Sequence, residues 1–332
     1  MGQLVNGTWT NAEGAVPTQG GAFARPQSAF QGKVEPGGRF PPQAGRYHLY
    51  ASLACPWAHR TLIFRKLKGL ESHIGLSVTH WLMAGEGWTF APGQGVIPDP
   101  FGAHALHETY TRTDPNHTGR VSVPVLWDTV EQTIVNNESA DIIRMFNSAF
   151  DRVGATGGDY YPKEHRSEID ALNERIYATV NNGVYKAGFA TTQGAHDTAI
   201  ATLFETLDWL EARLSRQPYL VGNHITEADW RLFTTLIRFD AVYHGHFKCN
   251  VRRLVDYPAL MRLTQSLYDV PGVAETVNFE HIKRHYYLSH PWLDPTGIVP
   301  VGPAHDTWRT GLPHTPPQAS VRAAESSGGS RT

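Results

Sequence analysis

The chain has 332 residues, enough for two domains of ordinary size with a hydrophobic core. Its 29 Lys and Arg nearly balance its 31 Asp and Glu, and a formal net charge of −2 argues against nucleic acid or a charged membrane surface as a partner. The two cysteines, Cys55 and Cys249, lie far apart in the sequence, which argues against a disulfide scaffold and favours reduced thiols in a cytoplasmic protein. Neither a signal-peptide pattern nor an apolar run of membrane-spanning length is present, so we expect no membrane association.

The first predicted elements are a strand, a helix and a second strand, preceded by an irregular arm. Residues 1–40 are rich in Gly, Pro, Gln and Ala without periodicity, which predicts an irregular N-terminal arm. The alternating, aromatic pattern of residues 47–51 predicts a strand. Pro56 suits the first position of a helix that Gly69 would end, and alternation over residues 74–78 predicts a second, parallel strand.

A long loop, a hairpin and a helix come next. Residues 82–120 contain several Gly and Pro and predict a loop, which at this length is usually functional or disordered. Residues 125–127 and 133–135 predict two short antiparallel strands, and residues 136–139 open a helix. The order strand, helix, strand, hairpin, helix is that of a thioredoxin-like domain, which we place at residues 41–155.

The second half of the chain has the periodicity of helices. Apolar residues recur at helical spacing after about residue 163, as in Ile169, Leu172, Ile176 and Val180. A capping pattern at residues 226–229 and a proline at Pro258 predict two further helix starts. We therefore expect an α/β plus all-α fold, with an all-helical domain at residues 163–290 and an irregular, partly disordered C-terminal tail at residues 291–332.

Cys55 lies at the predicted junction of a strand and a helix. Unpaired backbone N–H groups and the positive end of the helix dipole favour the thiolate there, and the thiolate is the reactive form. Ala58 takes the place of a resolving cysteine, so a mixed disulfide at Cys55 needs an external thiol, and glutathione is the abundant one in the cytosol. A buried structural cysteine is the alternative interpretation of Cys55, and it is the interpretation we prefer for Cys249.

Two further segments fit a glutathione site. Val123-Pro124 puts a proline where a strand begins, and a cis bond there would turn the Val123 backbone toward a peptide-like ligand. Glu138 and Ser139 at a helix start offer N–H groups, a hydroxyl and an acceptor, which suit the carboxylate and ammonium of a γ-glutamyl end. An ordinary trans turn proline and simple helix capping are the respective alternatives.

Several long motifs follow one another along the chain, at residues 47–50, 52–60, 119–128, 134–139, 181–189, 238–243, 246–250 and 281–287. Together they resemble the glutathionyl-hydroquinone reductases, the xi class of glutathione transferases. The resemblance extends from the N-terminal arm to about residue 303. It implies a homodimer that uses glutathione to reduce S-glutathionyl-hydroquinones to hydroquinones, with release of glutathione disulfide.

The resemblance also implies residue roles. Cys55 would be the nucleophile, with Tyr185 and Tyr286 as catalytic partners, and the aromatic substrate pocket would be lined by Tyr185, Tyr243 and Tyr286. Glutathione, as co-substrate, would be held by Trp88, Arg120, Val123, Glu138 and Ser139. We expect the tyrosine hydroxyls to hold the ring oxygens while the ring shifts to a keto tautomer, after which Cys55 attacks the glutathione sulfur. The expected partners are glutathione and glutathionylated aromatic small molecules.

Other hypotheses stay open at this point. An omega-like monothiol transferase, acting as a thioltransferase or dehydroascorbate reductase, needs the same Cys55 and glutathione site but no tyrosine pocket. A non-catalytic protein that binds aromatic ligands needs the pocket but not Cys55. A metal site at His281 and His285, with His290 nearby, has the spacing of one helical turn but lacks a matching carboxylate or cysteine pattern, so we expect no metal.

Overall fold

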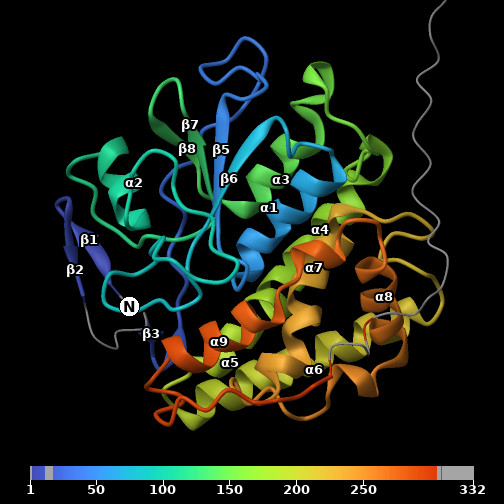
Figure 1. Cartoon of the computed structure of the whole chain (residues 1–332). Helices are drawn as coiled ribbons and strands as arrows, with labels where there is room; N and C mark the ends of the chain where they lie inside the picture. The colour runs from blue at the N-terminus through green and yellow to red at the C-terminus, as the bar shows by residue number, and fades with distance from the viewer. Residues whose placement is uncertain (1, 12–17, 305–307, 309–332) are drawn as a thin grey trace, which may run out of the picture.

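A four-stranded sheet with the strand order β6-β5-β7-β8 forms the centre of the first domain in the computed structural model, which describes residues 2–11, 18–304 and 308 (Figure 1). The strands are β5 (Tyr47–Ala51), β6 (Ile74–Val78), β7 (Val125–Asp128) and β8 (Thr133–Asn136). β5 pairs in parallel with β6 and antiparallel with β7, and β7 pairs antiparallel with β8. The predicted parallel pair and hairpin are therefore confirmed, and β5 is buried along its whole length.

Two helices of the first domain position its reactive end. α1 (Pro56–Leu67) connects the two parallel strands and packs against α3 (Ser139–Ser148). Pro56 occupies the first turn of α1, and Gly69 follows the end of α1 with a φ of +60°, a left-handed conformation that glycine adopts without steric cost. Both predicted boundaries of this helix are confirmed, so Cys55 lies directly before its first turn.

The second domain is helical, as predicted, and in the described part of the chain it runs from Lys163 to Ser289 without a strand. Its α-helices are α4 (Arg166–Ile176), α5 (Gly183–Gly188), α6 (Gln193–Leu214), α7 (Glu227–Arg238), α8 (Pro258–Tyr268) and α9 (Phe279–Ser289). The short 3-10 helices of this domain are η2 (Lys163–His165), η5 (Leu254–Asp256) and η6 (Ala274–Thr276), and η1 (Asp151–Val153) lies before it, at the end of the first domain. The π-helical segments η3 (Tyr177–Asn181) and η4 (Phe239–Tyr243) continue α4 and α7, and such segments often occur at functional sites.

α7 packs at the boundary between the two domains. All of its residues are buried, and it contacts α1 of the first domain as well as α4 and α8. At its start the Asp229 carboxylate accepts hydrogen bonds from the Thr226 backbone N–H (2.8 Å), the Thr226 hydroxyl (3.0 Å) and the Leu220 N–H (2.8 Å). The predicted capping pattern is therefore present. Burial raises the pKa of Asp229 to about 6, against the opposing effect of these hydrogen bonds.

The N-terminal arm has more regular structure than its composition predicted. It contains two antiparallel pairs, β1 (Gln3–Val5) with β2 (Thr8–Thr10) and β3 (Thr18–Gln19) with β4 (Ala22–Phe23). The arm is also tied to the first domain, because Leu4 N–H donates to the Gly119 carbonyl (2.9 Å) and Gly32 N–H donates to the Val135 carbonyl (2.8 Å). Strands of two or three residues carry no readable alternation, which is why the sequence pattern missed them.

The segment 82–120, predicted as a loop, contains the helix α2 (Leu106–Thr113). Leu106 and Tyr110 are fully buried, and the Glu108 carboxylate accepts hydrogen bonds from the N–H groups of His104 (3.0 Å) and Ala105 (2.9 Å). A helix of about two turns gives too little periodicity to stand out among the surrounding Gly and Pro residues. The loop prediction is therefore wrong for this part of the segment.

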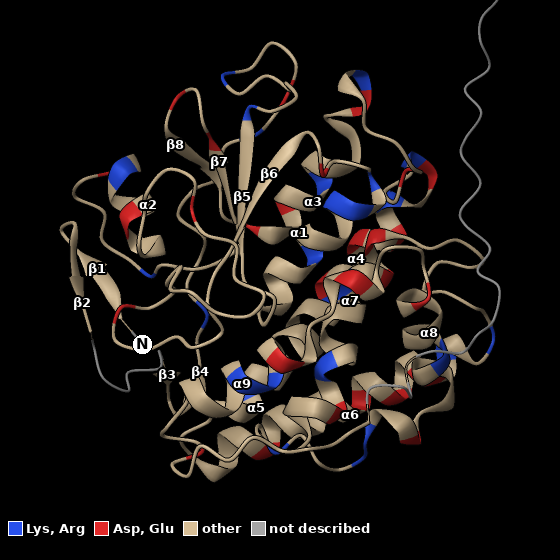
Figure 2. Cartoon of the chain, in the orientation of Figure 1, with Lys and Arg blue, Asp and Glu red and all other residues tan. Residues whose placement is uncertain are grey.

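The chain after α9 has no helix or strand up to residue 304. Trp308 is buried and stacks on Phe279 with ring centroids 6.2 Å apart, and the rest of the predicted tail lies outside the described residues. Acidic and basic residues are spread over both domains (Figure 2). In the described residues, no helix combines the length and the apolar character that crossing a membrane requires.

Candidate active site

Cys55 caps the amino-terminal end of α1 and is partly buried. Its Sγ lies 3.6 Å from the carbonyl oxygen of Val123, in the segment that leads into β7. The Val123-Pro124 peptide bond is cis. The start of α1 and the start of β7 thus meet at the sulfur, and the two residues singled out from separate motifs are direct neighbours.

Opposing effects act on the Cys55 thiol. Burial raises the pKa of Cys55 and is the largest effect, while the backbone N–H groups of Ala58 and Trp57, followed by the charges of Arg238 and Arg25, lower it. The helix start therefore favours the thiolate as expected. Desolvation of the sulfur outweighs this effect, so the pKa of Cys55 is raised overall. Cations near the sulfur consequently matter for its reactivity.

Arg238, at the end of α7, holds the backbone that precedes Cys55. Its side chain is fully buried; Nε donates to the Ala54 carbonyl (2.9 Å) and Nη2 donates to the Leu53 carbonyl (3.1 Å). Nη1 donates to Nδ1 of His59, 3.0 Å away on α1. The sequence analysis assigned no individual role to Arg238. The structure shows that the helical domain fixes the segment carrying the predicted nucleophile.

Cys55 lines a cavity of about 930 Å³ whose walls come from both domains. This volume is typical of a small-molecule site. The predicted site residues that line it are Cys55, Trp88, Arg120, Val123, Glu138, Ser139, Tyr185 and Tyr286. Tyr243 does not line it. The structure therefore brings the glutathione residues expected from the first domain and two of the three expected tyrosines to one cavity.

Glu138 and Ser139 lie at the start of α3, on the side of the cavity formed by the first domain. The Glu138 carboxylate accepts hydrogen bonds from the Ala140 N–H (3.1 Å) and, through its other oxygen, from the Ser28 hydroxyl (3.0 Å). The Ser139 hydroxyl donates weakly to Glu138 at 3.4 Å. Glu138 thus caps the helix, as the alternative interpretation held, while its carboxylate still lines the cavity.

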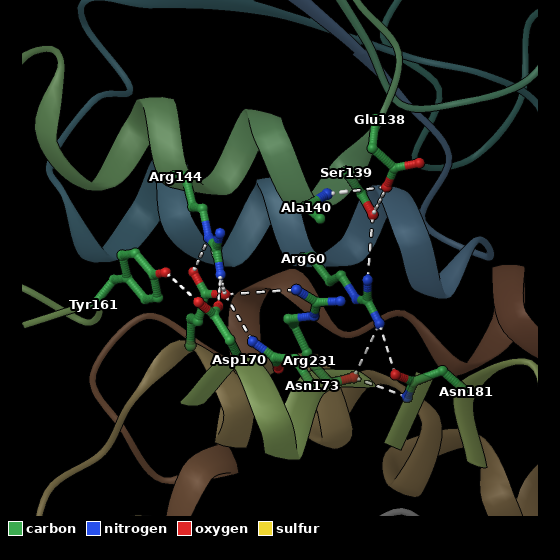
Figure 3. A network of polar contacts seen from close by, with 11 residues as sticks. Arg60, Glu138, Ser139, Ala140, Arg144, Tyr161, Asp170, Asn173, Asn181 and Arg231 are labelled. Atoms are coloured by element: carbon green, nitrogen blue, oxygen red, sulfur yellow. Dashed lines mark hydrogen bonds and ion pairs between the residues drawn. The ribbon is translucent and has the colours of Figure 1, made fainter. Parts of the chain in front are cut away.

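Arg60 is buried beneath this helix start and connects it to the helical domain (Figure 3). Nη1 donates to Ser139 Oγ (3.3 Å), and Nη2 donates to Asn181 Oδ1 (2.9 Å) and to the Arg231 carbonyl (3.4 Å). The Ser139 hydroxyl therefore accepts a hydrogen bond from Arg60 while it donates its own hydrogen in the weak 3.4 Å contact with Glu138. Burial lowers the pKa of Arg60, and the nearby charge of Arg231 lowers it further.

A second cluster joins α3 to α4 and α7 in the same region (Figure 3). The buried Glu227 carboxylate accepts hydrogen bonds from Arg144 (2.8 Å) and Asn173 (2.8 Å) and forms an ion pair with Arg231 (3.5 Å). Arg144 also pairs with Asp170. The middle of α3 is thereby tied to the helical domain.

Trp88 and Arg120 complete the part of the cavity expected to hold glutathione. Trp88 is buried and stacks on His285 of α9, with ring centroids 4.8 Å apart. Arg120 is partly buried, and burial lowers its pKa. Both come from the segment 82–120, so the long segment contributes to the site although it carries little regular structure.

The three predicted tyrosines form one hydrogen-bonded cluster. Tyr185 Oη lies 2.5 Å from Tyr286 Oη, which lies 3.1 Å from Tyr243 Oη. Tyr243 is fully buried and does not line the cavity, although it contacts both Tyr286 and Tyr185, which do. Burial raises the pKa of all three hydroxyls, which keeps them protonated and able to donate hydrogen bonds.

Histidines that the sequence did not assign to the site lie beside this cluster. His285 and His290 line the cavity, and His246 Nε2 lies 3.1 Å from His290 Nδ1. Burial lowers the pKa of His246 and His285 to about 4, so both are neutral at pH 7. His281 Nε2 and His285 Nδ1 contact the backbone carbonyls of Gln94 and Trp81, and among the described residues no group of three or more potential ligands is placed to hold a metal.

The sequence analysis missed the contribution of the N-terminal arm. Phe23, Arg25 and Ser28 all line the cavity, and Arg25 Nε donates to Asn182 Oδ1 at 2.7 Å. These contacts join residues more than 100 positions apart in sequence, so no local pattern could have revealed them. Cys249, in contrast, is fully buried and burial raises its pKa, which fits its interpretation as a structural cysteine.

Two family models match the chain. The model described as the N-terminal domain of glutathione S-transferase matches residues 54–149, and the model described as its C-terminal domain matches residues 193–265. These segments correspond to the thioredoxin-like and helical domains of the structure. The arm residues that line the cavity lie outside both.

Individual relatives are similar over most of the chain. The glutathionyl-hydroquinone reductase PcpF of Sphingobium chlorophenolicum is 57% identical over 305 residues, which covers 92% of this chain and 97% of PcpF. The glutathionyl-hydroquinone reductase YqjG of Escherichia coli is 52% identical, and the match covers 92% of this chain and 96% of YqjG. The glutathione-bound structure of YqjG matches with a TM-score of 0.84 and 50% identity, which covers 92% of this chain and 97% of the YqjG chain. The glutathione-S-transferase Xi structure from Phanerochaete chrysosporium is 49% identical, covers 86% of this chain and 94% of its own, and gives a TM-score of 0.84.

Proposed function

The chain belongs to the glutathione transferases of the xi class, the glutathionyl-hydroquinone reductases, and from this premise we propose that it uses glutathione to reduce S-glutathionyl-hydroquinones to hydroquinones. The observation that carries the proposal is that Cys55 opens into the same cavity as the hydrogen-bonded pair Tyr185 and Tyr286. A reactive thiol alone suits disulfide exchange. The paired hydroxyls supply what the cleavage of an aryl thioether needs in addition.

Glutathione binds along the first domain in this proposal. The Glu138 carboxylate takes the ammonium group of the γ-glutamyl end, while the Ser139 hydroxyl and the positive end of the α3 dipole take its carboxylate. The backbone of Val123 pairs with the peptide, and Trp88 and Arg120 hold the remaining part. The support is the placement of these groups around one cavity that also contains the Cys55 sulfur.

The aromatic ring lies against the tyrosines during the first chemical step. A hydroquinone hydrogen moves to the ring carbon that bears the sulfur, which gives a keto tautomer with a weakened carbon–sulfur bond. Tyr185 and Tyr286 donate hydrogen bonds to the ring oxygens, and because burial keeps their hydroxyls protonated they are suited to this role.

The Cys55 thiolate then attacks the glutathione sulfur. A sulfur–sulfur bond forms as the carbon–sulfur bond breaks, and the electron pair of the broken bond passes to the ring. The resulting enolate takes up a proton and leaves as hydroquinone. Because Ala58 stands where a resolving cysteine would be needed, the thiolate of a second glutathione attacks the mixed disulfide, releasing glutathione disulfide and free Cys55.

An omega-like thioltransferase is the second candidate, because Cys55 with Glu138 and Ser139 would suffice for it. The two functions separate in one experiment that measures two substrates. Release of free hydroquinone from a synthetic glutathionyl-hydroquinone is followed by chromatography in the presence of glutathione, for the wild type and Cys55→Ala. Reduction of the mixed disulfide of glutathione and 2-mercaptoethanol is measured in parallel.

The proposed function predicts Cys55-dependent release of hydroquinone. Activity on the mixed disulfide without release of hydroquinone would refute the proposal in favour of the omega-like function. If the wild type shows neither activity and Cys55→Ala still binds an aromatic ligand, the result would indicate a non-catalytic binding protein.

We further propose that the protein is a cytoplasmic homodimer. The support is the family resemblance and the two cysteines, which are both free in the structure. Sedimentation velocity of the full chain under reducing conditions tests the dimer, and a monomer at micromolar concentration would refute it.

A further inference from the structure

Arg25, in the N-terminal arm, extends its side chain over the aromatic part of the cavity. Its Cζ lies 4.7 Å from the ring centroid of Trp57, 4.8 Å from that of Tyr185 and 5.2 Å from that of Phe23. Its Nε donates to Asn182 Oδ1 at 2.7 Å. Three rings and a neutral amide therefore hold a guanidinium group beside a tyrosine of the hydrogen-bonded cluster.

The positive charge of Arg25 is not compensated by a carboxylate. Among the described residues no Asp or Glu forms an ion pair with Arg25. The three rings offer only their π faces, which attract the cation without neutralising it. The charge acts on groups in the cavity, since Arg25 lowers the pKa of both Cys55 and Tyr185 against the larger effect of burial. Such a cation stabilises an anion that forms near it.

The position of Arg25 indicates which anion this is. The groups proposed to bind the charged ends of glutathione, Glu138 and Ser139 at α3 and Arg120 before β7, come from the first domain. Arg25 instead lies over the aromatic rings that face the tyrosine cluster. We infer that Arg25 stabilises the negative charge that develops on the ring oxygens of the hydroquinone as the ring leaves the glutathione sulfur, an inference that rests on the proposed function.

The role is electrostatic and fits the electron balance of the attack by the Cys55 thiolate. When the thiolate of Cys55 forms the sulfur–sulfur bond, the electron pair of the broken carbon–sulfur bond becomes an enolate delocalised onto the ring oxygens. Tyr185 and Tyr286 donate hydrogen bonds to that charge, and Arg25 stabilises it by its field. Arg25 transfers no proton. A ring that carries electron-withdrawing substituents stabilises its own anion and therefore depends less on Arg25.

The test compares Arg25→Gln and Arg25→Lys with the wild type on three substrates. These are an unsubstituted glutathionyl-hydroquinone, a chlorinated glutathionyl-hydroquinone and the mixed disulfide of glutathione and 2-mercaptoethanol, which has no ring. Arg39→Gln is the matched control, because Arg39 is an exposed arginine of the same arm that pairs with Glu131 at 2.7 Å.

We expect Arg25→Gln to lower kcat on the unsubstituted ring by roughly 10- to 100-fold, less than the loss for a fully buried donor because Arg25 is partly exposed. The loss is smaller on the chlorinated ring, the mixed disulfide is reduced within about threefold of the wild-type rate, and Arg25→Lys recovers part of the activity because it keeps the charge. Arg39→Gln behaves as the wild type.

Three results would overturn the inference. They are an unchanged kcat in Arg25→Gln, an equal loss on the two rings, and an equal loss on the mixed disulfide, which would show that Arg25 acts through Cys55 or glutathione. Failure of the proposed function looks different. In that case the wild type itself releases no hydroquinone while it still reduces the mixed disulfide.

Discussion

The substitution Tyr286→Phe separates the chemical role of the tyrosine cluster from its packing role. It removes a hydroxyl that lies 2.5 Å from Tyr185 Oη and 3.1 Å from Tyr243 Oη, and it leaves the ring in place. We predict that kcat for a glutathionyl-hydroquinone falls by about 100- to 1,000-fold, the usual loss when one donor to a developing oxyanion is removed. This corresponds to about 2.7–4 kcal/mol of transition-state stabilisation.

The same substitution also lowers stability by an amount that the structure bounds. Two hydrogen bonds between buried hydroxyls are lost, each contributing about 0.5–1.5 kcal/mol to the free energy of unfolding. We therefore expect Tyr286→Phe to be destabilised by about 1–3 kcal/mol. Because ordinary domains have about 5–15 kcal/mol of stability, the variant should fold and its kinetics should be measurable.

Tyr243→Phe is the matched control, since Tyr243 is fully buried and does not line the cavity. It removes the 3.1 Å hydrogen bond but leaves Tyr286 bonded to Tyr185. We predict a destabilisation of about 0.5–1.5 kcal/mol and a loss of kcat below about tenfold. Steady-state release of hydroquinone and unfolding in urea measure the two quantities. Equal rate losses in the two variants, or a wild-type rate for Tyr286→Phe with the pocket shown to be occupied, would refute the role of Tyr286.

Three further predictions concern two residues near the site, Glu138 and Arg60, and the buried His48 of β5. Glu138→Gln keeps an oxygen for the Ala140 N–H but removes the charge that the glutathione ammonium needs. The KM for glutathione should therefore rise by about 10- to 100-fold, with a smaller change in kcat. An unchanged KM would exclude Glu138 from glutathione binding. Arg60→Met removes the donor to Ser139, Asn181 and the Arg231 carbonyl. Urea unfolding should show a loss of about 2 kcal/mol in the free energy of unfolding, and kinetics should show a raised KM for glutathione. A loss of stability with no change in KM would contradict the link to Ser139. Burial lowers the pKa of His48 to about 4 in the folded state, so between pH 6.5 and pH 4 the unfolded state binds the extra proton and stability falls as the pH drops. The pH dependence of unfolding should therefore be shallower in His48→Gln by about 1.4 kcal/mol per pH unit, and identical slopes would refute this contribution.

The parts of the fold that were predicted correctly are those specified by local signals. Pro56 and Gly69 mark the two ends of α1, alternation marks β5 and β6, and a capping pattern marks the start of α7. These signals act over a few residues and have direct backbone causes. They are sufficient to place Cys55 at the start of a helix, because the strand before it and the helix after it are both recognisable.

The parts that were missed depend on contacts between distant segments. The strands of the N-terminal arm have two or three residues, and the Arg25 side chain is held by Trp57, Tyr185 and Asn182, which lie far from it in sequence. No periodicity or composition encodes such contacts. The tyrosines were chosen by family resemblance, and only the structure separates Tyr243, the member of the cluster that does not line the cavity, from the two that do.

The central claim is that Cys55 takes the glutathionyl group from the substrate. Intact-protein and peptide mass spectrometry after a single turnover test it most directly, with the enzyme mixed with excess glutathionyl-hydroquinone and no free glutathione. The account predicts one glutathionyl group on Cys55, an equal amount of free hydroquinone, and an unmodified Cys249, since Cys249 is fully buried. Release of hydroquinone from an enzyme whose Cys55 carries no glutathionyl group would contradict the account.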